Sequence, residues 1–187
     1  MSAHYSQAPA LRVSQWINTN QSIELAALRG RVVVVHAFQM LCPACVSHGL
    51  PQARALRELF TQGDVVVLGL HTVFEHHDVM TAAALRAFAH EYRLRFPIGI
   101  DMPSKSNPMP LTMRAYALEG TPSLMLIDRR GRLRLTHFGP MPDLEAGVLV
   151  GQLVAEESGA QALANDERQA PTPDNGCDDA GCPAPAP

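Results

Sequence analysis

Two cysteines separated by two residues, Cys42 and Cys45, are the side chains of this sequence that most directly indicate chemistry. They follow an apolar run at residues 31–38 and precede a helical pattern, so they lie where a strand meets a helix. Backbone N–H groups and the helix dipole favour a thiolate at the start of a helix. We therefore expect Cys42 to be the exposed nucleophile and Cys45 the buried resolving thiol. Such a pair exchanges two electrons with a dithiol or disulfide partner through a mixed disulfide.

The elements around this pair are predicted by the pattern of apolar residues. Four successive valines at 32–35 indicate a strand buried on both faces, as in the centre of a parallel or mixed sheet. The helix after Cys42 should run to about Phe60 and bend at Pro51, which cannot donate a backbone hydrogen bond. A second apolar run at 65–70 then predicts another buried strand. Strand, helix and strand together make a right-handed βαβ unit.

The remainder of the chain reads as alternating strands and helices, followed by a polar tail. Thr81 is a suitable N-cap for a helix that continues to Tyr92. Further elements are expected at residues 96–100 (strand), 111–118 (helix), 123–127 and 132–136 (hairpin) and from 142 (last helix). The fold class is thus α/β, with a central mixed sheet flanked by helices and an N-terminal extension. We predict a domain over residues 1–165 and a disordered tail over 166–187.

Composition and charge exclude several classes of function. The chain has 187 residues, of which 47% are hydrophobic and 18% charged, enough for one domain with a substantial core. Its net charge is −3 and no basic stripe is evident, so no nucleic-acid partner is expected. No apolar run approaches the roughly 20 residues that span a bilayer. The first six residues lack the features of a secretory signal, so we expect a cytoplasmic protein with no membrane partner.

Three stretches together resemble the thioredoxin superfamily, and more narrowly its TlpA-like and redoxin-type thiol-disulfide oxidoreductases. They are residues 28–35, the Cys42-Pro43-Ala44-Cys45 motif and residues 120–131, and the resemblance spans about residues 10–157. The resemblance implies a thioredoxin-like fold in which Thr121-Pro122 is a cis peptide facing the cysteines. The backbone beside Pro122 would then be available to hold an extended substrate chain. It also implies protein disulfide or dithiol partners, such as a thioredoxin or glutathione system, and no cofactor or metal.

Histidines stand at two positions where the family carries carboxylates. Thioredoxins have a buried Asp six residues before the first cysteine, and this chain has His36 there. Many TlpA-like proteins have a Glu six residues after it, and this chain has His48. A cationic imidazole would favour a thiolate, whereas a neutral one could take the proton of Cys45. Either histidine could instead be structural or simply solvated.

Other features leave alternatives open. Cys177 and Cys182 in the tail are either incidental thiols or an accessory pair for redox exchange or metal capture. His71, His76 and His77 are expected in a solvated loop. A peroxiredoxin-like peroxidase shares this fold, but Gln39 replaces the threonine that its signature requires. A Sco-like copper carrier would use the histidine and methionine loops, although such proteins have three residues between their cysteines rather than two.

Overall fold

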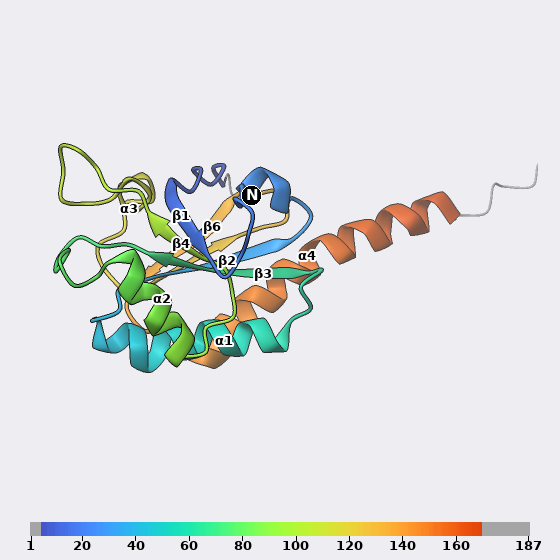
Figure 1. The fold of residues 1–187 in the computed structure, drawn as a ribbon. Coiled ribbons are helices and arrows are strands. Elements are labelled where there is room, and N and C mark those ends of the chain that lie inside the picture. Colours follow the sequence, from blue (N-terminus) through green and yellow to red (C-terminus); the bar gives the residue numbers. More distant parts are fainter. Residues whose placement is uncertain (1–4, 170–187) are drawn as a thin grey trace, which may run out of the picture.

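The computed structural model describes residues 5–169, with side chains up to residue 156. Six strands form one mixed sheet in the order β1-β4-β3-β2-β5-β6 (Figure 1). β2, β3 and β4 are mutually parallel, whereas β1 and β5 are antiparallel to the neighbours they pair with, as is β6. This confirms the predicted mixed sheet. The strands are β1 (Val13–Ile17), β2 (Val32–Phe38), β3 (Val65–His71), β4 (Ile98–Asp101), β5 (Ser123–Ile127) and β6 (Leu133–Phe138).

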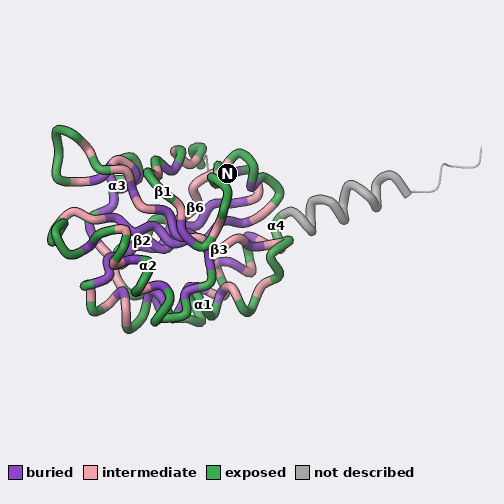
Figure 2. Tube along the Cα trace, in the orientation of Figure 1, coloured by how far each residue is buried: buried purple, intermediate pink, exposed green. Residues whose placement is uncertain are grey.

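Helices cover both faces of this sheet. The even-numbered β2 residues Val32, Val34 and Phe38 pack in one core cluster with residues of three helices, namely α1 (Leu50–Leu59), α2 (Ala82–Glu91) and α4 (Asp143–Gln169). The odd-numbered ones pack on the other face with the short helices η1 (Leu25–Leu28) and α3 (Leu111–Ala115). All seven β2 residues are buried, and Figure 2 shows the burial concentrated along the central strands. The valine run was therefore interpreted correctly, because a strand in the middle of a two-sided core needs apolar side chains on both faces.

The helix after the cysteines differs from the single bent helix predicted. A π-helical segment, η2 (Cys45–Gly49), precedes α1, which begins at Leu50. Pro51 lies at the N-terminal end of α1 rather than inside it. Because Pro51 has no N–H, the carbonyl four residues before it loses its usual partner, and the irregularity falls before the proline. Single-turn π segments of this kind often occur at functional sites.

His71 is not in the solvated loop where the sequence placed it. It is the last residue of β3, with only 1% of its surface exposed, and its ring centroid lies 5.4 Å from that of Phe38. The strand continues one residue further than its apolar run because His71 pairs with Phe38 of β2 and Ile100 of β4. His76 and His77 are exposed, as expected.

The C-terminal predictions are only partly covered. α4 runs to Gln169, past the residue 165 at which the domain is predicted to end, and that boundary stays a prediction. Cys177 and Cys182 lie outside the described residues. None of the described helices is long and apolar enough to cross a membrane.

Candidate active site

The two cysteines form a disulfide at the C-terminal end of β2, with their Cα atoms 5.2 Å apart. Cys42 is half-buried and Cys45 fully buried, as their proposed roles require. Pro43 and Ala44 already have helical conformation, so Cys42 lies immediately before the first helical residue. The backbone N–H of Cys45 donates to Cys42 Sγ over 3.2 Å. This N–H and the helix start both favour a thiolate at Cys42 when the disulfide opens.

Thr121 and Pro122 lie opposite the cysteines. The peptide bond between them is cis, and Cys42 Sγ is 3.5 Å from the Thr121 carbonyl oxygen. β5 begins directly after them and runs antiparallel to β2, with Ser123 paired to Ala37. That pairing brings a segment some 80 residues away in sequence to the same sheet edge as the cysteines. The family resemblance predicted both the cis bond and its position facing the cysteines, and the structure confirms them.

His36 is buried under this edge, with 2% of its surface exposed. Burial lowers its pKa to about 4, although Asp143 partly offsets the effect. The imidazole is therefore neutral at pH 7, which excludes the cationic alternative for His36 in this state. Its Nε2 has no hydrogen-bond partner in the described part of the chain. His36 is therefore a buried imidazole with one ring nitrogen free to accept or donate a hydrogen bond.

A narrow cavity lies beside His36, between η2 and the strand edge. Its lining comprises His36, His48, Gly49, Gln52, Pro122, Ser123, Leu124, Gly139, Pro140 and Met141. The cavity measures about 10 Å³, close to the room that one water molecule needs. Gly49 sets its width, because a Cβ there would lie 3.3 Å from Pro122 Cβ and 3.8 Å from His36 Nδ1. The glycine thus lets the helix approach Pro122 closely.

His48 occupies the outer side of this cavity. It is exposed, and its Nδ1 lies 2.7 Å from Ser47 Oγ. The structure therefore brings His36 and His48 to one small cavity, one buried and one in contact with solvent. The cavity therefore has a buried imidazole on its inner side and an exposed imidazole on its outer side.

Gln52 and Gln39 support the site, and the sequence reasoning missed both. Gln52 is buried and donates to the Met141 carbonyl and to Asp143 Oδ1, both over 2.8 Å, which fixes the start of α4 beside the cavity. The sequence does contain an indication of Gln52, because a polar glutamine stands next to Ala53 on the otherwise apolar face of α1. Gln39 is 1% exposed, and its carbonyl accepts from the Cys42 N–H over 3.3 Å. Its position just beyond the strand gave no comparable signal.

The described residues include no group of three or more His, Cys, Asp and Glu side chains that could hold a metal ion. At this edge the structure places a disulfide and, lining one small cavity beside it, two imidazoles. Whether the tail cysteines join it lies outside the described residues.

Comparison with known proteins agrees with this geometry. Residues 5–152 match the Redoxin family model. The solved structure of a thioredoxin-like superfamily protein, SPOA0173, is 52% identical with a TM-score of 0.79, covering 81% of this chain and 97% of that one. That of a thiol-disulfide isomerase from Corynebacterium glutamicum is 48% identical with a TM-score of 0.76, covering 80% and 97%.

A curated relative, the protein DipZ of Mycobacterium tuberculosis, is 26% identical over 150 residues. The match covers 79% of this chain but only 20% of the length of that relative. The family match covers well over half of the chain, and the two solved structures are similar over nearly their whole length. The chain therefore belongs to the Redoxin family and has a thioredoxin-like fold.

Proposed function

We propose that this protein exchanges electrons with disulfides of other proteins through the Cys-Pro-Ala-Cys pair. The observation that carries the proposal is the position of Cys42. Cys42 is partly exposed at a helix start, its sulfur lies 3.5 Å from the Thr121 carbonyl oxygen, and Cys45 is fully buried. A substrate sulfur can therefore reach Cys42 from solvent, whereas Cys45 is closed to solvent.

In the reducing direction the reaction has two steps. The Cys42 thiolate attacks one sulfur of the substrate disulfide, the substrate S–S bond breaks, and the released substrate thiolate takes up a proton. Cys45 then loses its proton and attacks the Cys42 sulfur, and the second substrate thiolate leaves. The protein ends with the Cys42–Cys45 disulfide, and the substrate has gained two electrons and two protons. The oxidising direction is the reverse.

Apolar side chains beside the cysteines favour a polypeptide substrate over a small polar disulfide. Leu41, next to Cys42, is 58% exposed, and Phe138 is 51% exposed. Phe138 packs over Gly120, where a Cβ would lie 2.8 Å from its ring, so its position next to Thr121 is fixed. These two side chains would cover apolar residues of a partner while the backbone at Thr121 and Pro122 positions the chain.

We further propose that His36 assists the second step as a neutral base. Full transfer of a thiol proton to an imidazole of pKa about 4 is uphill. The thiol of Cys45 therefore loses its proton as it attacks, not beforehand. One water molecule in the cavity beside His36 would let the proton pass to His48 and solvent.

Replacing His36 should slow the second step more than the first. In a background with Cys177→Ser and Cys182→Ser, dithionitrobenzoate releases one thionitrobenzoate when Cys42 attacks and another when Cys45 resolves the mixed disulfide. We expect His36→Ala to slow the second release about 10-fold or more and the first much less. His71→Ala is a matched control, because His71 is equally buried with a similarly lowered pKa. If His36→Ala slows both releases equally, His36 does not act as the base in the second step. The same conclusion follows if His71→Ala slows the second release as much as His36→Ala does.

The direction of electron flow is best tested by the reduction potential of the pair, measured by glutathione equilibration at pH 7. A value near about −270 mV would fit a reductase that a cytoplasmic thioredoxin or glutathione system keeps reduced. A value near about −120 mV would make the protein an oxidant and contradict a reducing role in the cytoplasm. We expect the lower potential. Failure to form any Cys42–Cys45 disulfide in this titration would refute the proposed function itself.

A further inference from the structure

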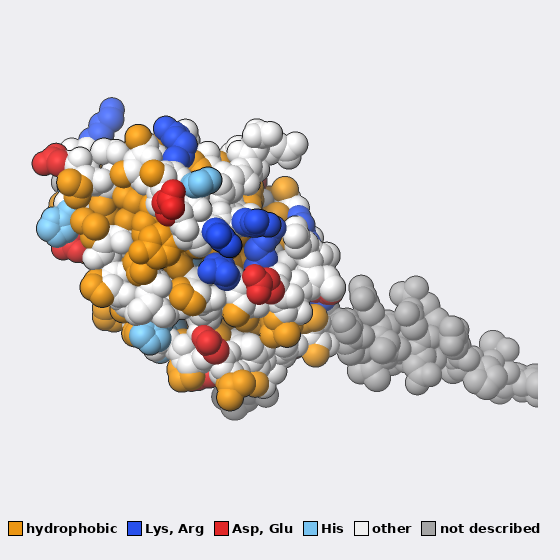
Figure 3. All heavy atoms as spheres, turned by 60° about the horizontal axis from the view of Figure 1, so that its bottom comes forward, with side chains coloured by type: hydrophobic (Ala, Val, Ile, Leu, Met, Phe, Trp, Pro, Cys, Tyr) orange, Lys and Arg blue, Asp and Glu red, His pale blue; other side chains and the backbone are white. Residues whose placement is uncertain are grey.

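A groove lined by arginines lies at the sheet edge opposite the cysteines. We call it the arginine groove, and its five arginines are Arg31, Arg54, Arg57, Arg93 and Arg95. Two adjoining hollows of about 390 and 260 Å³ share Arg57 and Arg95 and so form one surface. Figure 3 shows a group of blue side chains gathered near the centre of the face that α1 and α2 cover. A third of the 15 Lys and Arg residues of a chain with net charge −3 therefore lines one groove.

Little negative charge balances this groove. Glu58 is the one carboxylate residue that lines either hollow. In the part of the chain that the structure describes, Arg54, Arg57, Arg93 and Arg95 form no ion pair. Arg57 does lie in the last turn of α1, where it offsets the helix dipole. That role does not account for arginines gathered from three separate segments of the chain.

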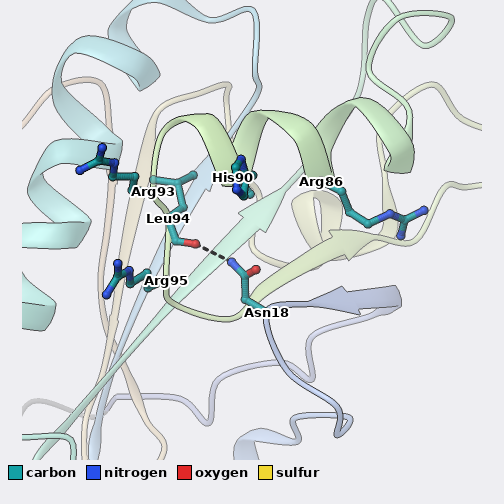
Figure 4. A pocket seen from close by; sticks show the side chains of 7 residues that line it. Asn18, Arg86, His90, Arg93, Leu94 and Arg95 are labelled. Atoms are coloured by element: carbon teal, nitrogen blue, oxygen red, sulfur yellow. Dashed lines mark hydrogen bonds between the residues drawn. The ribbon is translucent and has the colours of Figure 1, made fainter.

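The loop that carries two of these arginines is held in place. Asn18 Nδ2 donates to the Leu94 carbonyl over 2.6 Å and to the Phe96 carbonyl over 3.1 Å. Leu94 is buried between Arg93 and Arg95, and Figure 4 shows both guanidinium groups on the same side of the loop, toward α1. Arg93 has a φ of 52° after the end of α2, a position at which glycine is usual. The guanidinium groups are thus presented from a fixed backbone, which lowers the entropy cost of binding an anion.

This chain contains an acidic segment of its own that can reach the groove. Residues 170–187 carry Asp174, Asp178 and Asp179 and no Lys or Arg. α4 leaves the sheet near one end of the groove, because Arg129 Nη2 donates both to the Val154 carbonyl and to Asp64, next to Val65 of the groove lining. From Glu156 to Gln169 the helix adds about 20 Å. The 18 residues that follow extend up to about 60 Å, enough to return and lie across the groove.

From these observations we infer that residues 170–187 dock in the arginine groove through their three aspartates. Guanidinium groups pair with carboxylates in two-pronged hydrogen bonds, so several aspartates in one segment suit several arginines on one surface. Docking would hold Cys177 at the groove. Cys42 lies at the far end of β2, about 20 Å away along the seven-residue strand.

The test uses backbone amide NMR spectra of the full chain. A tail variant carries Asp174→Asn, Asp178→Asn and Asp179→Asn, and a groove variant carries Arg93→Gln and Arg95→Gln. We expect the tail variant to shift the amide signals of residues 93–95, and the groove variant to shift those of 174–179. Arg12→Gln with Arg114→Gln is the control, since both side chains are exposed and lie outside the groove, and it should leave the tail signals unchanged. Groove signals that stay at their wild-type positions in the tail variant would overturn the inference.

Competition with a hexaglutamate peptide distinguishes docking of the tail from docking of an acidic segment of another protein. A docked tail excludes the peptide, so the peptide should bind the tail variant at least about 3-fold more tightly than the wild type. Equal affinity for both would mean that the groove is open to an acidic segment of another protein, and would refute docking of the tail. Shifts that change with protein concentration would also refute it, because they indicate docking between molecules.

Discussion

Cys42→Ser should lose disulfide reductase activity by about 1,000-fold or more, to near the uncatalysed rate. A serine hydroxyl is not ionised at pH 7 and does not exchange with disulfides. Cys45 cannot substitute, because it is fully buried beneath Cys42. The measurement is reduction of a protein disulfide, with a dithiol as electron donor, by wild type and variant at equal concentration.

The neighbouring cysteine supplies the matched control for this result. Cys45→Ser keeps the nucleophile but cannot resolve, so it should accumulate a mixed disulfide with the substrate that mass spectrometry detects at Cys42. Circular dichroism should give the same spectrum for both variants and for the reduced wild type. Turnover by Cys42→Ser close to that of the wild type would contradict the assignment of the nucleophile. Loss of activity in Cys177→Ser with Cys182→Ser would instead give the tail pair an obligatory role.

Acidification from pH 7.5 to pH 5 should lower the free energy of unfolding by about 4 kcal/mol through two buried histidines. Burial lowers the pKa of His36 and of His71 to about 4, against 6.5 in the unfolded chain. Between these values the unfolded state binds more protons than the folded state, so stability falls as the pH falls. Each histidine contributes about 2 kcal/mol of this loss at pH 5. Urea unfolding at several pH values measures it.

Single substitutions divide this pH dependence between the two histidines. His36→Gln and His71→Gln should each remove about half of the loss between pH 7.5 and pH 5, since both imidazoles stay neutral in the folded chain over this range and do not repel each other. The pKa values of Asp64, Asp128 and Glu156 are lowered by their hydrogen bonds and arginine neighbours, so these groups destabilise the fold only at more acidic pH. An unchanged pH dependence in both variants would mean that the histidines are not buried as described.

Elements whose signals are local could be predicted from the order of residues alone. The valine run, the Cys42 and Cys45 spacing at a strand–helix junction and the Thr81 cap each depend on neighbouring residues. The structure has a buried strand, a disulfide and a capped helix at these places, with Thr81 Oγ1 accepting from the Ala84 N–H. The cis peptide at Thr121-Pro122 was predicted from the family resemblance rather than from propensity, which favours trans.

The surroundings of these elements could not be predicted in this way, because they depend on how distant segments pack together. The low pKa of His36 arises from burial between β2 and the helices, and the close approach of Gly49 to Pro122 arises from strand pairing across the sheet. His71 became a core residue because β2 and β4 pair with it on either side, although its neighbours in sequence include polar and charged residues. The arginine groove brings together segments around residues 31, 54–57 and 93–95. Local patterns encode helices and strands, whereas burial and electrostatic surroundings depend on contacts between residues far apart in the chain.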